Sequence, residues 1–281
     1  MSSPTLPTGR PDITCHHHRA GPARVARPTG GVLRPVGPPS KEKNTLSSPT
    51  LPTGRPDIAG RSKKVWFVEP GRCVVEMIPS LRSFTHDRDE LIDGTAELRL
   101  DFFEYVSGAL AKAGVHTVFR ERLGPITYLA DYRPAGPFEV IVKNRATGST
   151  TRKYPGLFEE GQVFAPPVVK FDYRTDPEDQ PIGEDYLRRT GVDVEAYRRL
   201  ALACNTVLHT LVSPLELWDF CLVIAPDEER GLVINSEISP DCMRLRRADG
   251  EPYDKDLFRH GASREQVIER WTELMGLMRR G

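Results

Sequence analysis

Apolar residues gather in several short runs beyond residue 60 that have the length of β-strands and are bounded by turn residues. In chain order these stretches are residues 64–77, 117–132, 138–142, 217–224 and 231–235. Pro70-Gly71 divides the first stretch and Gly124-Pro125 divides the second, so each predicts strands joined by a turn. A charged turn at residues 226–230 separates the last two stretches.

Other stretches carry apolar residues at the three- and four-residue spacing of a helix. Residues 89–114 have this spacing and end at Gly114, a typical helix stop. A regular stripe over residues 197–211 predicts a long core helix. The last predicted helix begins at a capping box formed by Ser263 and Gln266. Its buried face is predicted to contain Val267, Trp271, Leu274, Met275 and Met278.

Residues 1–59 differ from the rest, since they are rich in Pro, Gly, Ser, Thr and Arg and poor in large apolar side chains. Such a segment buries too little surface to offset its ordering entropy, and we predict that it is disordered. The same string occurs in it at residues 2–13 and 47–58, which indicates a duplication rather than a folded repeat. The later mixture of strands and helices predicts an α+β fold, with a strand-rich lobe at residues 60–136 and an α+β lobe at residues 137–281.

Composition narrows the class of partner. The 39 basic and 39 acidic residues cancel, so no general attraction draws the chain to nucleic acid or to an anionic membrane. The five cysteines have no metal-site or redox spacing, which is typical of free thiols in a reducing cytoplasm. No apolar run approaches the ~20 residues that cross a bilayer. We therefore expect a cytoplasmic protein with small-molecule ligands, which local basic groups must hold.

Polar segments next to predicted strands carry the candidate chemistry. In residues 139–149 a strand leads into Lys143 and then Gly148-Ser149, an order of cation, glycine and hydroxyl that suits a phosphate. Residues 237–244 place carboxylates and Arg244 just after an apolar strand, which suits Mg²⁺, an amine or a phosphate. Taken alone, each pattern is equally typical of a solvated strand end or surface loop.

Two further segments are weaker by themselves. Residues 253–256 form a charged turn that contains Asp254 and Lys255. Residues 60–63 place basic side chains before a strand and could lie over nucleotide phosphates, although the glycine pattern of a Walker loop is absent.

Together and in this order, the segments resemble the SAICAR synthetase family. Members carry a Gly-Lys-x-Lys turn, a Val-Val-Arg-Asn-x-x-x-Gly-Ser segment, a Pro-Pro run before an acidic loop, Asp-Phe-Lys-x-Glu, Asp-Glu-x-x-Pro-Asp-x-x-Arg and Asp-Lys. The corresponding segments here are residues 60–63, residues 142–149, Pro166-Pro167 with residues 176–184, Asp219-Phe220-Cys221, residues 237–244 and Asp254-Lys255. The resemblance covers roughly residues 60–261 and is strongest from Phe138 onward.

The resemblance implies that ATP binds between the lobes and phosphorylates the carboxylate of an aminoimidazole ribotide, and that the amine of aspartate then attacks the acyl phosphate, with Mg²⁺ neutralising charge. The expected partners are thus a ribotide and an amino acid, and a homo-oligomer is left open. By position, ATP would contact Gly60, Arg61 and Lys63. The ribotide would contact Lys143, Asn144, Ser149, Arg244 and Lys255. The implied catalytic residues are Asp219, Glu237 and Asp241, with Glu237 also the metal ligand.

Several family positions differ here. The family's Asp-Phe-Lys-x-Glu is Asp219-Phe-Cys221-Leu-Val223, so a lysine and a metal-binding glutamate are replaced. Ser236 stands where the family has a second metal-binding aspartate. Lys143 replaces an arginine and keeps the charge without the bidentate fork.

These replacements leave different functions open. The chain is an ATP-dependent amide-forming ligase, a relative that acts on a similar ribotide as a lyase or hydrolase, or a binding protein without catalysis. Because the predicted phosphate site matches the family while the metal positions do not, these residues favour ligand binding over intact ATP chemistry. The family resemblance still puts the first hypothesis in front, and the second follows closely.

Overall fold

The computed structural model describes residues 52–83, 86–175 and 178–280, which belong to one compact unit. Most of the predicted extension, residues 1–51, lies outside the described residues. The described fold extends before the boundary predicted at Gly60. Ile58 and Ala59 form a short strand that pairs with the strand after Gly60, so the described fold already includes them.

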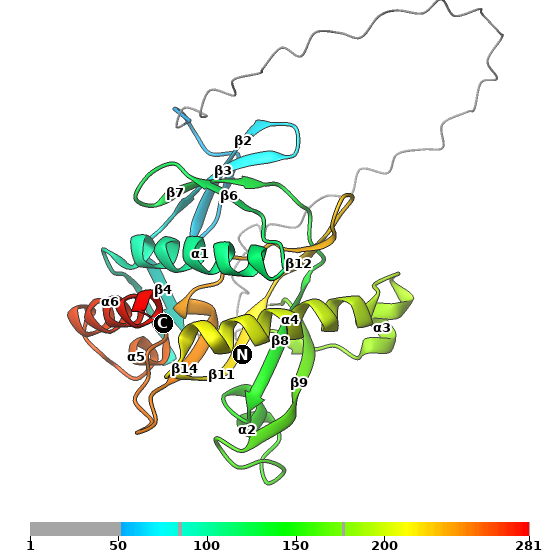
Figure 1. The fold of residues 1–281 in the computed structure, drawn as a ribbon, viewed down its shortest axis with the longest axis vertical. Coiled ribbons are helices and arrows are strands. Elements are labelled where there is room, and N and C mark those ends of the chain that lie inside the picture. Colours follow the sequence, from blue (N-terminus) through cyan, green and yellow to red (C-terminus); the bar gives the residue numbers. More distant parts are fainter. Residues whose placement is uncertain (1–51, 84–85, 176–177, 281) are drawn as a thin grey trace, which may run out of the picture. The chain divides into compact units, whose positions relative to one another are not determined.

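The first sheet is antiparallel throughout and has the strand order β1-β2-β3-β7-β6 (Figure 1). Its strands are β1 (Ile58–Ala59), β2 (Lys63–Glu69), β3 (Arg72–Met77), β6 (Phe119–Arg122) and β7 (Thr127–Asp131). The predicted turns at Pro70-Gly71 and Gly124-Pro125 are confirmed, because each joins two paired strands. At Gly71 the positive φ of 75° is a conformation that glycine adopts without strain.

The predicted helix at residues 89–114 begins later than expected. Residues Arg88–Leu91 form strand β5, which pairs with β4 (Ser80–Ser83), and helix α1 spans Thr95–Lys112. The prediction began too early because the apolar spacing continues from the strand into the helix. Gly94, which has a positive φ, lies between the strand and the first residue of the helix. Gly114 has a positive φ just after the helix, as expected of a helix stop.

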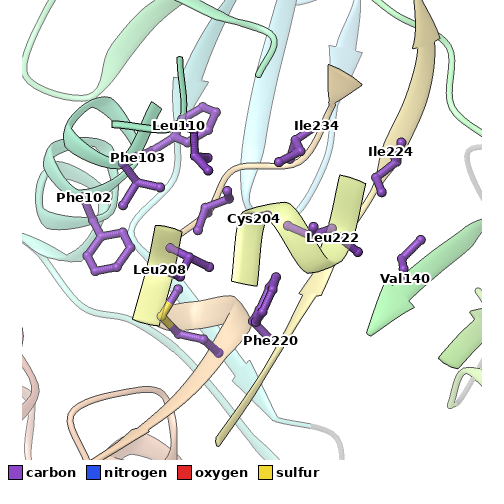
Figure 2. Packing of buried hydrophobic residues seen from close by; sticks show 14 of the residues in the cluster. Phe102, Phe103, Leu110, Val140, Cys204, Leu208, Phe220, Leu222, Ile224 and Ile234 are labelled. Carbon is purple, nitrogen blue, oxygen red and sulfur yellow. The ribbon is translucent and has the colours of Figure 1, made fainter. Parts of the chain in front are cut away.

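The second sheet is also antiparallel, in the order β10-β9-β8-β11-β14. Its strands are β8 (Phe138–Arg145), β9 (Val163–Tyr173), β10 (Gln180–Pro181), β11 (Glu216–Leu222) and β14 (Met243–Arg246). One face is apolar and packs against helix α4 (Val194–Val212). Figure 2 shows Val140, Phe220 and Leu222 of this face near Cys204 and Leu208 of α4. The other face carries Lys143, Lys170, Asp172 and Asp219, because strand side chains alternate.

The predicted strand at residues 217–224 is divided at Val223. Beyond it, β12 (Ile224–Asp227) pairs with β13 (Gly231–Ile234), so the turn is shorter than predicted. The Asp227 carboxylate begins the turn by accepting hydrogen bonds from the backbone N–H groups of Glu229 and Arg230.

The remaining elements are α2 (Ser149–Lys153), α3 (Glu184–Arg189), the 3-10 helix η2 (Pro240–Cys242), α5 (Asp256–Arg259) and α6 (Arg264–Arg280). The capping box of α6 is confirmed, since Ser263 and Gln266 each bond the backbone N–H of the other. Its predicted apolar face is buried. Helices α1, α4 and α6 contact one another, which completes an α+β fold as predicted. Within the described residues, no helix has the length and apolarity to span a membrane.

Candidate active site

A cavity of about 590 Å³ lies over the polar face of the second sheet. The strands β8, β9, β11 and β14 contribute side chains to its wall, and residues of α2, η2 and α5 complete it. Of the residues predicted from sequence, the cavity brings together Lys143, Ser149, Asp219, Asp241 and Arg244. Segments more than 90 positions apart in the chain therefore meet, which only the sheet order of β8, β11 and β14 makes possible.

Gly148 lies directly against the Arg244 guanidinium. The glycine has φ 61° and ψ −116°, a conformation that side-chain-bearing residues rarely adopt. A Cβ added to it would stand 2.5 Å from Nη2 of Arg244. Glycine is required here both by backbone conformation and by space. Arg244 and Ser149, the residue after Gly148, both line the cavity.

Asp219 fixes the basic groups of this wall. Its carboxylate accepts hydrogen bonds from Nη1 of Arg244 at 2.9 and 3.1 Å and from Nζ of Lys143 at 2.7 Å. Burial by itself would raise the pKa of Asp219, but the charges of Arg244 and Lys143 outweigh it and hold the pKa below its ordinary value. Asp219 therefore stays ionised. Its position opposite both Lys143 and Arg244 in the strand register explains the contact.

Glu237 lies in a second buried ion cluster, which does not line the cavity. Its carboxylate accepts hydrogen bonds from Nε and Nη2 of Arg99 at 2.7 and 2.8 Å, and Nζ of Lys63 lies 2.9 Å away. Ser239 Oγ donates to the same carboxylate at 2.9 Å. Burial would raise the pKa of Glu237, but Arg99 and Lys63 bring it far below its ordinary value. The cluster joins α1 and β2 to the segment after β13.

Arg99 is the member that sequence analysis missed. It lies inside the apolar stripe of α1, where the helical pattern draws attention to its neighbours Leu98 and Leu100. Its side chain is only 1% exposed, which is rare for arginine without a partner. The sequence does show a charged residue on the apolar face of a predicted helix, which indicates a buried ion pair. It does not show that the partner of Arg99 is Glu237, 138 positions away.

Other predicted residues occupy different places. The Asn144 amide donates to Asn205 of α4 and to the Leu217 carbonyl and accepts from Asn205, so it joins β8 to α4. Its amide is thus occupied on the core side of the sheet. The ribotide contact of Asn144 stays a prediction. Lys255 does not line the cavity itself, but its Nζ lies 2.7 Å from Oδ1 of Asp241, which does.

The predicted ATP-binding turn is formed by the β1–β2 connection. Gly60 N–H donates to the Lys63 carbonyl at 2.9 Å, which closes the turn. Arg61 pairs with Asp89, and Lys63 extends to Glu237. In this arrangement both basic side chains have carboxylate partners.

The residues at the family's metal positions do not fit a protein-held Mg²⁺. Val223 has no ligand oxygen in its side chain, and Ser236 Oγ accepts a hydrogen bond from the Val223 N–H at 3.0 Å. Glu237, the predicted metal ligand, has two cations and a hydroxyl at its carboxylate instead. Among residues 52–83, 86–175 and 178–280, no cluster of three or more His, Cys, Asp or Glu side chains has the arrangement of a metal site.

Comparison with known proteins places this geometry in a family. The sequence model described as SAICAR synthetase matches residues 58–275. A phosphoribosylaminoimidazole-succinocarboxamide synthase of Bacillus cereus is 32% identical over 225 residues, covering 77% of this chain and 92% of that protein. The protein of the same name from Methanocaldococcus jannaschii is 31% identical and covers 72% and 86%. The one from Methanothermobacter thermautotrophicus is 38% identical, but the match spans only 64% of its length.

Solved structures show the same fold. A SAICAR synthetase in complex with ADP has a TM-score of 0.73 at 23% identity and covers 80% of this chain and 97% of that chain. The phosphoribosylaminoimidazole-succinocarboxamide synthase of Ehrlichia chaffeensis has a TM-score of 0.74 at 23% identity, with coverage of 80% and 98%. The chain therefore belongs to the SAICAR synthetase family of carbon–nitrogen ligases.

Proposed function

We propose that this protein is an ATP-dependent ligase that forms an amide between aspartate, or a related amine, and a carboxylated aminoimidazole ribotide or a close analogue. The observation that carries the proposal is the cavity wall at Gly148, Ser149 and Arg244. A guanidinium that Asp219 holds against a bare glycine backbone, in a cavity that Ser149 also lines, suits the phosphate of a ribotide.

In this proposal each group on the wall has a distinct task. Arg244 and the Ser149 hydroxyl bind the phosphate, and Lys143 adds positive charge behind them. Asp219 positions Arg244 and Lys143 so that little side-chain entropy is lost when the ligand binds. ATP would activate the ribotide carboxylate, and the amine would displace phosphate from the acyl phosphate. No residue is assigned to Mg²⁺, because Val223 and Ser236 at the metal positions do not supply the carboxylate ligands that it needs.

A second candidate function is supported by the same lack of carboxylate ligands at the metal positions. A protein that keeps the phosphate wall but has Val223 and Ser236 at the metal positions is suited to bind a ribotide without using ATP. It would then act as a lyase or hydrolase on the ribotide, or bind it without turnover.

One assay distinguishes these functions. The purified protein is incubated with ATP, Mg²⁺, L-aspartate and the carboxylated ribotide, and ADP and ribotide products are followed by chromatography. ADP and succinyl amide in equal amounts support the ligase. Ribotide turnover without ADP supports the lyase or hydrolase, and saturable ribotide binding without turnover supports a binding protein.

The double variant Val223→Glu with Ser236→Asp tests the metal positions. We expect it to raise ligase activity and the apparent affinity for Mg²⁺, because it supplies two ligand carboxylates. The carboxylate introduced by Ser236→Asp could still accept the Val223 backbone hydrogen bond that the Ser236 hydroxyl accepts now. Measurement of the rate against Mg²⁺ concentration checks this, with Ser236→Ala as control. Full activity of the natural sequence at low Mg²⁺, unchanged in the double variant, would refute our reasoning on these positions.

A further inference from the structure

Two cysteines that are distant in the sequence meet on the cavity wall. Cys221 lies on β11, and Cys242 is the last residue of η2, just before β14. The antiparallel register pairs Phe220 with Met243. The next residue on each strand is therefore Cys221 on one side and Cys242 on the other, and the two come opposite each other. Both are partly exposed, and both line the cavity.

The two thiols are close enough to interact. A hydrogen bond between them, together with burial, raises the pKa of the Cys221 thiol well above its ordinary value. Residues directly opposite each other on antiparallel strands have Cα atoms about 4.5 or 5.5 Å apart, and both distances lie within the range that a disulfide bridges. Cys73 and Cys204, by contrast, are buried and do not line the cavity. Among the cysteines that the structure describes, Cys221 and Cys242 are thus the accessible pair.

The thiol form of Cys242 also stabilises η2. Its Sγ donates a hydrogen bond to the Ser239 carbonyl at 3.2 Å and accepts one from the Ser239 N–H at 3.4 Å, which completes a capping box. η2 carries Asp241, which lines the cavity, and it directly precedes the strand that carries Arg244. A disulfide sulfur has no hydrogen to donate, so a bond from Cys242 to Cys221 removes the contact with the Ser239 carbonyl.

We propose that Cys221 and Cys242 form a redox-sensitive dithiol, which a hydroperoxide oxidises to a disulfide and which thereby loses the capping contact of η2. The site takes a small two-electron oxidant, such as hydrogen peroxide, that enters the cavity. In a reducing compartment the dithiol is the resting form, and the disulfide forms transiently. The assignment is independent of the proposed ligase function, because it requires neither ATP nor a ribotide.

The oxidation balances with one molecule of peroxide. Because Cys221 holds its proton more tightly than an ordinary thiol, the Cys242 sulfur attacks first. This attack breaks the O–O bond, forms a sulfenic acid on Cys242 and releases water. The Cys221 sulfur then attacks the sulfenic sulfur, forms the S–S bond and expels hydroxide, which leaves as water with the Cys221 proton. Glu139, whose carboxylate contacts the Cys221 thiol, can carry that proton.

Alkylation after oxidation tests the assignment. The full chain carries Cys15→Ser in this experiment, because Cys15 lies outside the described residues. It is treated with hydrogen peroxide, denatured and alkylated with iodoacetamide, and the intact mass counts the alkylated cysteines. We expect Cys221 and Cys242 alone to escape alkylation, and dithiothreitol to restore both. In Cys221→Ala and in Cys242→Ala, no disulfide should form.

Cys73→Ala and Cys204→Ala are matched controls, because each removes a buried cysteine that does not line the cavity. Both should keep the dithiothreitol-reversible protection. Alkylation of every remaining cysteine after oxidation overturns the proposal. Protection that is lost in Cys204→Ala but persists in Cys221→Ala also overturns it, because a bond from Cys242 to Cys204 then explains the result. If Cys221→Ala does not fold, Cys242→Ala provides the comparison with the natural pair.

Hydrogen exchange tests the effect on η2. The backbone amides of Asp241 and Cys242 bond Ser239 in the reduced protein. We expect them to exchange faster in the disulfide form, while the amides of α6 keep their rates. Cys221→Ala should show no change after the same treatment. Equal exchange at η2 in the oxidised and reduced protein overturns the loss of the capping contact.

A ribotide titration connects the dithiol to the phosphate wall, and this reading alone rests on the proposed function. We expect oxidation to raise the ribotide dissociation constant by roughly fivefold, the effect of one lost cap, and dithiothreitol to reverse it. If the reduced protein does not bind the ribotide, the proposed function is wrong, while alkylation and exchange still decide the dithiol. An unchanged dissociation constant in the disulfide form overturns the connection between η2 and Arg244.

Discussion

At the scale of single residues, the site depends on contacts that only one residue type can make at each position. Gly148 permits both a strained backbone conformation and the approach of Arg244, and Asp219 holds that guanidinium from the other side. Glu237 has a comparable position in the second cluster, where Arg99, Lys63 and the Ser239 hydroxyl contact its carboxylate. We therefore expect a substitution at Gly148 to weaken ribotide binding and a substitution at Glu237 to lower the stability of the fold.

Gly148→Ala should weaken ribotide binding by about tenfold or more, a loss of roughly 1.4 kcal/mol, because the added Cβ displaces the Arg244 guanidinium. Isothermal titration with the ribotide measures the dissociation constant. Gly156→Ala is the matched control, since Gly156 also has a positive φ but nothing lies within 4 Å of its added Cβ. Equal binding by both variants would show that Arg244 does not contact the phosphate.

Glu237→Gln should destabilise the fold by about 3–5 kcal/mol at neutral pH, because it leaves Arg99 and Lys63 buried without a counter-charge. Urea unfolding followed by fluorescence measures the loss. Glu216→Gln, which breaks a half-exposed pair with Arg145, should cost no more than about 1 kcal/mol.

The same variant has a defined pH dependence. The folded pKa of Glu237 lies far below the ordinary 4.5, so its stabilisation is complete above pH 4.5 and is lost as the pH falls towards the folded pKa. The stability difference between wild type and Glu237→Gln should therefore shrink below pH 4.5. A difference that is constant down to acid unfolding would contradict this ion cluster.

At the scale of elements, α4 anchors the strand that begins the phosphate wall. The paired amides of Asn144 and Asn205 join β8 to α4 beneath that wall. The two faces of β8 thus have different tasks: Asn144 fixes the strand to the helix, and Lys143 extends to Asp219 on the cavity side.

Asn205→Ala should lower stability by about 1–3 kcal/mol, because the buried Asn144 amide loses its partner. The ribotide dissociation constant should change less than twofold if Asn144 is structural. Chemical unfolding and ribotide titration of the same preparation check both expectations, with Thr206→Ala on the exposed side of α4 as control. Weak binding at unchanged stability would return Asn144 to the ribotide site.

At the scale of the whole molecule, the described fold begins before residue 60. The Asp57 carboxylate accepts a hydrogen bond from the Phe67 N–H at 2.8 Å, and Trp66 Nε1 donates to the Gly54 carbonyl at 3.2 Å. β1 therefore belongs to the first sheet, and the Gly60–Lys63 turn depends on it.

A chain that begins at Ser48 keeps all these contacts, whereas a chain that begins at Gly60 loses them. We expect the first to melt at the temperature of the full chain and the second to melt several degrees lower, at roughly 2–4 °C per kcal/mol lost. Calorimetry of the three chains measures the difference. Identical melting of both shortened chains would show that β1 contributes nothing to stability.

The sequence by itself determined part of the secondary structure and the family. Strand and helix periods identified about half of the strands and the α4 and α6 helices, since local patterns follow local geometry. They did not identify β9 and β14, which line the cavity. The polar segments around Ser149 and Arg244 led to the SAICAR synthetase resemblance, which the comparisons confirm.

Only the tertiary structure decided which charges meet. Arg99, Lys63 and Glu237 come from three distant segments, and so do Lys143, Asp219 and Arg244. Strand order and register fix those meetings, and a one-residue shift would reverse every side chain. The alternation of β8 likewise turned Asn144 to the core and Lys143 to the cavity.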